Sequence, residues 1–114
     1  MSPITTHILD TSLGRPAEGI FVTLDQHNDE DESWETLAVG VTNGDGRIAD
    51  LLERAPLSSG TYRLIFALTQ YFELQKIKSF YPQVTIEFQI VDPAQHYHVP
   101  LLLSPFGYST YRGS

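Results

Sequence analysis

The 114-residue sequence contains no cysteine, and this absence excludes several kinds of chemistry at once. Without thiols the chain has no disulfide, no thiolate ligand for zinc and no cysteine nucleophile. Positive charge is also scarce, because 7 Lys and Arg stand against 14 Asp and Glu, for a formal net charge of −7. Since no basic stripe is present to hold a phosphate backbone, we expect no nucleic-acid partner.

Long apolar runs are missing as well. No stretch approaches the roughly 18 consecutive apolar residues that a membrane-spanning helix needs, so we expect no membrane association. The first seven residues contain neither the basic segment nor the apolar run of a secretory signal. We therefore expect a cytoplasmic protein, and its length fits a single domain over residues 1–114.

The negative charge is concentrated in one short segment. Residues 25–35 contain no Lys or Arg and six acids, which are Asp25, Asp29, Glu30, Asp31, Glu32 and Glu35. The run at 29–32 predicts a solvated loop between strands. By contrast, residues 93–111 contain no Asp, Glu, Lys or Arg. A long uncharged stretch in a small domain is typical of a segment that is buried between subunits.

The dominant pattern along the chain is an alternation of apolar and polar residues, which is typical of β-strands. It is clearest in Val-Thr-Ile-Glu-Phe-Gln-Ile at 84–90. The same pattern predicts strands at 20–25, 37–41 and 62–68, and more weakly at 4–10, 47–52, 97–104 and 107–112. An apolar residue at every third position predicts one short helix within 70–78. These elements indicate an all-β fold, an antiparallel β-sandwich.

Histidines are the first candidates for chemistry. In the strand predicted at 4–10, His7 lies on the face opposite Ile4 and Ile8, so it should point away from the core. His98 should point outward from the strand at 97–104 in the same way. Because terminal strands often pair in sandwiches, His7 and His98 could share one sheet. The simpler alternative is that each is an ordinary surface residue.

A zinc site is a second possibility for these histidines. His96 and His98 share one strand face about 7 Å apart, and His7 would complete a three-histidine site with an open position for water. The His-x-His spacing is a weak signal by itself, so this alternative stays open. The segment Asn43–Gly46 is too short for a calcium loop and predicts a turn that holds Arg47 at its exit.

Five blocks of the sequence, in order, resemble those of the transthyretin-like 5-hydroxyisourate hydrolases. The blocks are 6–10 followed by 14–17, then 42–47, 80–84, 96–100 and 101–114, which ends in Tyr-Arg-Gly-Ser. They run from residue 6 to residue 114 and so cover nearly the whole chain. The resemblance implies a sandwich of two four-stranded sheets with one short helix. It also implies a homotetramer whose active sites line a channel between dimers.

The resemblance further implies an activity and a set of site residues. The family hydrolyses 5-hydroxyisourate, a product of urate oxidation, to 2-oxo-4-hydroxy-4-carboxy-5-ureidoimidazoline, with neither metal nor cofactor. Its catalytic positions fall on His7, Arg47, His98 and Ser114, and its substrate pocket adds Tyr111, Arg112 and Gly113. A histidine with a pKa of about 6.5 can take the proton of an attacking water at neutral pH. We favour His7 as this base, but the sequence leaves the choice between the two histidines open.

Two functions from other classes are compatible with a sandwich. A carrier of hydrophobic hormones would share the fold and the channel, although it has no need of two histidines and an arginine at that channel. A plain interaction domain would explain the strand pattern but would leave the five sequence blocks unexplained.

Overall fold

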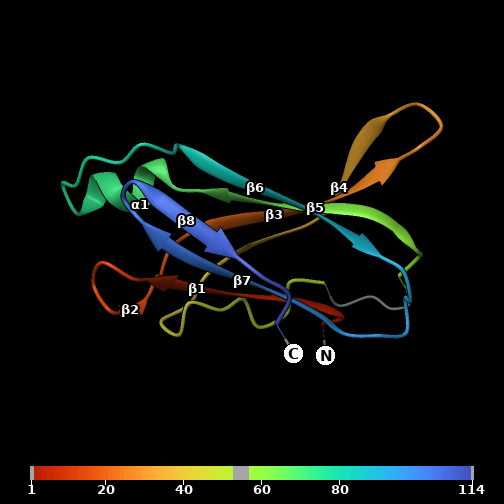
Figure 1. Ribbon diagram of the computed structural model, residues 1–114, viewed down its shortest axis with the longest axis horizontal. Coiled ribbons are helices and arrows are strands. Elements are labelled where there is room, and N and C mark those ends of the chain that lie inside the picture. The colour runs from red at the N-terminus through yellow and green to blue at the C-terminus, as the bar shows by residue number, and fades with distance from the viewer. Residues whose placement is uncertain (1, 53–56, 114) are drawn as a thin grey trace.

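Two four-stranded sheets face each other in the computed structural model, which describes residues 2–52 and 57–113 (Figure 1). The first sheet has the strand order β2-β1-β7-β8, and the second has the order β4-β3-β5-β6. The elements are β1 (Ile4–Asp10), β2 (Arg15–Pro16), β3 (Phe21–Asn28), β4 (Ser33–Val41), β5 (Gly60–Ala67), α1 (Thr69–Leu74), β6 (Gln83–Ile90), β7 (Tyr97–Ser104) and β8 (Gly107–Thr110). The predicted all-β sandwich with one short helix is confirmed.

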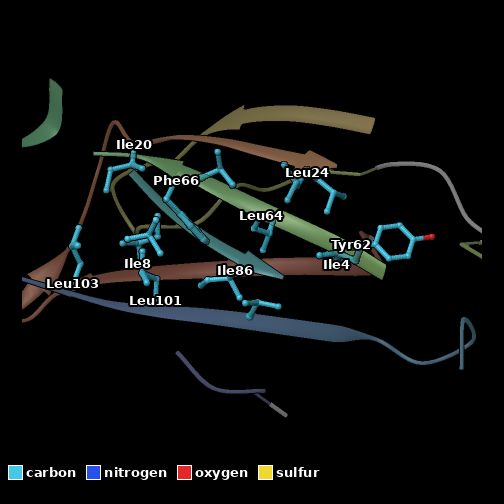
Figure 2. Packing of buried hydrophobic residues seen from close by; sticks show 14 of the residues in the cluster. Ile4, Ile8, Ile20, Leu24, Tyr62, Leu64, Phe66, Ile86, Leu101 and Leu103 are labelled. Atoms are coloured by element: carbon cyan, nitrogen blue, oxygen red, sulfur yellow. The ribbon is translucent and has the colours of Figure 1, made fainter. Parts of the chain in front are cut away.

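The hydrophobic core lies between the two sheets (Figure 2). Along β1 the buried and half-buried residues alternate, so that Ile4 and Ile8 point into the core. Leu101 of β7 joins them from the same sheet, and Leu64 and Phe66 of β5 face them from the other. The intervening residues of β1 and β7 therefore lie on the outer face of the first sheet.

One strand pair departs from the predicted antiparallel arrangement. β1 and β7 run parallel, with Ile4 opposite Tyr97 and Asp10 opposite Leu103, whereas the other paired strands are antiparallel. A parallel pair needs a long connection, and here the whole second sheet separates β1 from β7 along the chain. Alternation of side chains is the same in both directions, which is why the sequence pattern did not reveal this.

The predicted strand at 47–52 is wrong. In that segment Arg47 makes a single antiparallel bridge with His7, and turns follow. An antiparallel continuation of this bridge would pair residues 48 and 49 with Thr6 and Thr5, but the chain turns at 49–50 instead. Residues 15–16 form the short strand β2, which pairs with Leu9 and Asp10 further along β1.

Several element boundaries differ from the prediction. β3 and β4 are longer than the predicted 20–25 and 37–41 and form a hairpin, whose turn at 29–32 is the predicted acidic loop. β8 ends at Thr110 rather than at 112. The helix covers Thr69–Leu74 rather than 70–78, because Lys76 takes a left-handed conformation with φ +57° and Ile77 N–H returns to the carbonyl of Phe72. No helix in the described ranges is long and apolar enough to cross a membrane.

Candidate active site

His7 and His98 lie on the outer face of the first sheet, as the sequence predicts. Both rings are half-buried, and both come from central, paired strands. In the β1–β7 register Thr5 is opposite His98 and His7 is opposite Pro100. His7 and His98 are therefore diagonal neighbours on one sheet face, and the prediction that they share a sheet is confirmed.

Arg47 is brought to His7 by the predicted turn. The side-chain oxygen of Asn43 accepts the N–H of Asp45 at 2.9 Å and that of Arg47 at 3.2 Å, and Asn43 N–H donates to the carbonyl of Arg47 at 2.8 Å. Gly46, with φ +73°, accepts the N–H of Ile8 at 2.9 Å. This hydrogen bond joins the turn to β1. Arg47, the next residue, therefore lies beside His7 and forms a bridge with it.

The end of the chain lies beside His98. Gly113 N–H donates to the carbonyl of His98 at 2.8 Å, which makes an isolated bridge with β7. The approach is so close that a Cβ on Gly113 would overlap Cδ2 of the His98 ring. Ser114, the fourth predicted catalytic residue, lies outside the described residues.

Two depressions meet at His98. One, of about 420 Å³, lies over β1 and is lined by Thr5, Thr6, Arg47, Ile48, Ala49, His96 and His98. The other, of about 270 Å³, is more apolar and is lined by Ile86, Phe88, Gln89, Tyr97, His98, Val99, Thr110, Tyr111 and Arg112. The structure therefore brings together His7, Arg47 and His98, but it places Tyr111 and Arg112 on the other side of the His98 ring.

Arg112 is held by its own neighbours in the second depression. Its Nη2 donates to Oε1 of Gln95 at 3.0 Å, and its guanidinium lies 4.5 Å from the centre of the Tyr97 ring. Tyr111, by contrast, is 59% exposed and makes no side-chain hydrogen bond to another described residue. Its ring is therefore available to a ligand or to a second copy of the chain.

Thr5 is a residue of the site that the sequence did not indicate. Its Oγ1 lies 2.8 Å from Nδ1 of His98 and 3.1 Å from Nε2 of His96, so one hydroxyl contacts two imidazoles. Thr5 shares a strand face with His7, which the alternation shows. Its position opposite His98 could not be predicted, because it depends on the parallel register of β1 and β7, which the sequence does not indicate.

Both site histidines are less basic than a free imidazole. Burial lowers the pKa of His7, and the charge of Arg47 lowers it further, although the nearby Asp45 opposes this. Burial and Arg47 also lower the pKa of His98, with smaller contributions from His96 and His7, although a backbone hydrogen bond with Thr5 opposes this. At neutral pH the site therefore presents two neutral imidazoles beside a guanidinium, which is always charged. Such a site can accept a proton from water and bind the oxygens of a polar ligand.

The zinc alternative finds no support in the geometry. Within residues 2–52 and 57–113, no group of three or more His, Asp or Glu side chains is placed to hold a metal ion. His7, His96 and His98 do not converge as a three-histidine site requires, and the hydroxyl of Thr5 contacts both His96 and His98.

Removing the charge of Arg47 should raise the pKa values of both site histidines. In Arg47→Gln we expect the pKa of His7 and of His98 to move up toward 6.5, because a neutral amide no longer opposes protonation. An NMR titration of the histidine ring resonances measures this directly. Lys78→Gln removes one positive charge elsewhere and should leave both values unchanged. Unaltered pKa values in Arg47→Gln would contradict the electrostatic coupling.

Comparison with known proteins places the chain in a family. The HIUase/Transthyretin family matches residues 4–113. The 5-hydroxyisourate hydrolase of Salmonella dublin is 48% identical over 111 residues, which cover 97% of this chain and 80% of that protein. The 5-hydroxyisourate hydrolase of Mus musculus is 44% identical over 113 residues, covering 99% and 96%.

Solved structures of proteins from this family have the same fold as this chain. The 5-hydroxyisourate hydrolase of Klebsiella pneumoniae is 43% identical with a TM-score of 0.84, covering 100% of this chain and 94% of that one. Sea bream transthyretin in complex with thyroxine is 32% identical with a TM-score of 0.90, covering 97% and 94%. From the match over residues 4–113 and these relatives, the chain belongs to the HIUase/Transthyretin family.

Proposed function

We propose that this protein hydrolyses 5-hydroxyisourate, an oxidation product of urate, to 2-oxo-4-hydroxy-4-carboxy-5-ureidoimidazoline. The observation that carries the proposal is the meeting of His7, Arg47 and His98 on one face of the first sheet. The relatives named 5-hydroxyisourate hydrolase, which are 48% and 44% identical over nearly the full chain, support it.

In the proposed reaction, water attacks a ring carbonyl. The oxygen of water adds to the carbonyl carbon, and a ring carbon–nitrogen bond then breaks. The proton that water loses passes to a base and then to the leaving nitrogen, so no other reactant is consumed. A positioned base is typically worth about 10²–10⁴ in rate. We assign this role to His7, since burial and the charge of Arg47 lower its pKa and favour the neutral ring that can accept a proton.

We propose that Arg47 and the C-terminal residues 111–114 hold the substrate. The planar guanidinium presents several N–H donors that suit the oxygens of a purine-like ring. Donors fixed in advance near a developing negative charge often contribute more to catalysis than any other single effect. Because the C-terminal segment is bonded to β7 at His98, it is placed to close the site from the opposite side. A reaction of this kind needs no metal and no cofactor.

A carrier of hydrophobic ligands is the second candidate function. Sea bream transthyretin in complex with thyroxine has the same fold, and the TM-scores of 0.90 and 0.84 do not distinguish a carrier from a hydrolase. The two imidazoles beside a guanidinium support the hydrolase, because a carrier of an apolar ligand does not need a base near neutral pH. A plain interaction domain would leave this arrangement without a purpose.

An ultraviolet assay tests the proposal. The absorbance of freshly prepared 5-hydroxyisourate is followed with and without protein, and we expect decay to accelerate in proportion to protein concentration. The rate should survive prolonged chelation and dialysis. Thyroxine binding without any acceleration would favour the carrier. Loss of activity on chelation, with recovery on adding zinc, would contradict the metal-free mechanism.

We also propose that the protein is a homotetramer with its sites in a channel between dimers. β6 and β8 are edge strands of their sheets, and exposed edges favour pairing with another chain. Large apolar side chains near these edges are exposed, among them Phe80, Phe106 and Tyr108. Light scattering at micromolar concentration should give about four times the chain mass of 12.8 kDa. A monomer with full activity would rule out a site shared between subunits.

A further inference from the structure

The hydroxyl of Thr5 links two imidazole rings on the outer face of the first sheet. Its distances of 2.8 Å to Nδ1 of His98 and 3.1 Å to Nε2 of His96 are both those of hydrogen bonds. A threonine hydroxyl carries a single hydrogen. When both bonds form, it must therefore donate to one ring and accept from the other.

His96 determines the direction of this chain of hydrogen bonds. Its side chain is exposed, and in the charged form both ring nitrogens carry hydrogen, so Nε2 can only donate. The neutral Nε2–H form of His96 donates in the same way. In both forms Thr5 receives a hydrogen bond from His96 and donates its own hydrogen to Nδ1 of His98, and only the neutral Nδ1–H form of His96, whose Nε2 accepts, would reverse the direction.

The single ring hydrogen of His98 is then on Nε2. Burial and Arg47 lower the pKa of His98 and so favour the neutral ring, which carries one hydrogen. With Nδ1 accepting from Thr5, that hydrogen has no other position. Nδ1 faces β1 and Cδ2 faces Gly113, so both edges of the ring are covered. Nε2, at the tip remote from the β7 backbone, is the ring nitrogen that neither contact covers.

We propose that Thr5, together with His96, is a positioning residue that holds His98 as its Nε2–H tautomer. The proposal rests on the proposed hydrolysis and deepens it. His98 becomes a hydrogen-bond donor to the carbonyl oxygen under attack and is not the base. His7 hydrogen-bonds with the backbone of Asp45, and its other ring nitrogen keeps the lone pair that takes the proton from water.

NMR of the resting protein tests the tautomer without any substrate. In protein with 15N-labelled histidine, long-range proton–nitrogen correlations distinguish Nδ1–H from Nε2–H rings. We expect Nε2–H for His98 in the unmodified protein and in Thr5→Ser, which keeps the hydroxyl. In Thr5→Val, which has the same shape without the hydroxyl, we expect a mixture of both tautomers. An Nδ1–H ring in the unmodified protein at neutral pH would overturn the proposal.

Kinetics provide the second measurement. Thr5→Val should lower kcat about tenfold with a smaller change in KM, because one oriented hydrogen bond is lost in the transition state. Thr5→Ser should restore most of the rate. His96→Gln keeps a donor and should be close to wild type, and His96→Ala should be far milder than His98→Ala because water can replace an exposed ring.

A matched substitution separates this effect from loss of fold. Thr61 lies half-buried on the outer face of the second sheet, so Thr61→Val is the same change away from His7, His96 and His98. It should leave kcat unchanged, and thermal unfolding should show both valine variants to be folded. Wild-type kcat and an unchanged tautomer in Thr5→Val would overturn the proposal. If the unmodified protein does not hydrolyse 5-hydroxyisourate but its His98 tautomer depends on Thr5, the positioning role stands and the proposed function fails.

Discussion

Replacing His7 by alanine is expected to lower kcat/KM for 5-hydroxyisourate by at least about a hundredfold. The base would be lost, and no other neutral imidazole with a free lone pair faces the site in the proposed arrangement. The fold should remain intact, because His7 points away from the core and is only half-buried. Steady-state ultraviolet kinetics and circular dichroism of the same preparation measure both quantities.

Arg47→Ala and His98→Ala should cause losses of the same order for a different reason. Each removes a donor aimed at the oxygens on which negative charge develops, rather than the base. His27→Ala is the matched control, since His27 lies near the acidic hairpin turn and bonds to Asp29 there. It should keep the wild-type rate. A wild-type rate in any of the three site variants, measured on folded protein, would remove that residue from the mechanism.

The second large effect is expected from Gly46→Ala, which should impair stability and activity together. Gly46 has φ +73°, a conformation that costs other residues about 1–2 kcal/mol. A Cβ there would also overlap the carbonyl oxygen of Ile8 in β1. We expect the free energy of unfolding to fall by about 2 kcal/mol or more. We also expect kcat to fall, because Arg47 is the next residue.

Gly44→Ala provides the control for this substitution within the same turn. An added Cβ at Gly44 has no neighbour within 4 Å, so stability and kcat should be nearly unchanged. Urea unfolding and the ultraviolet assay on both variants make the comparison. Equal stability of the two variants would show that the close contact between the turn and β1 does not hold Arg47 in place.

The sequence pattern revealed which way each strand faces but not which strands meet. Alternation was sufficient to place His7 outward from β1, and the turn residues Asn43–Gly46 were sufficient to predict the turn before Arg47, because both depend on local chemistry. The parallel pairing of β1 with β7 is a long-range property, and so is the contact of Thr5 with His98 that follows from it. The alternation at 47–52 did not reveal the turn at 49–50, which ends the pairing after the single bridge of Arg47 with His7. The tetramer, the single domain, the cytoplasmic location and the roles of the site residues stay predictions.

The β1–β7 pairing also determines when a newly synthesised chain can form its candidate active site. Thr5 and His98 are 93 positions apart, and the backbone that holds the His98 carbonyl comes from Gly113. During synthesis β1 has to wait, with its β7 edge unpaired, until almost the entire polypeptide has left the ribosome. Closing so long a loop is slow compared with forming the local hairpin of β3 and β4. Appearance of hydrolytic activity during refolding should therefore lag behind the β-sheet signal, which makes the enzyme's own turnover a reporter of the last steps of folding and assembly.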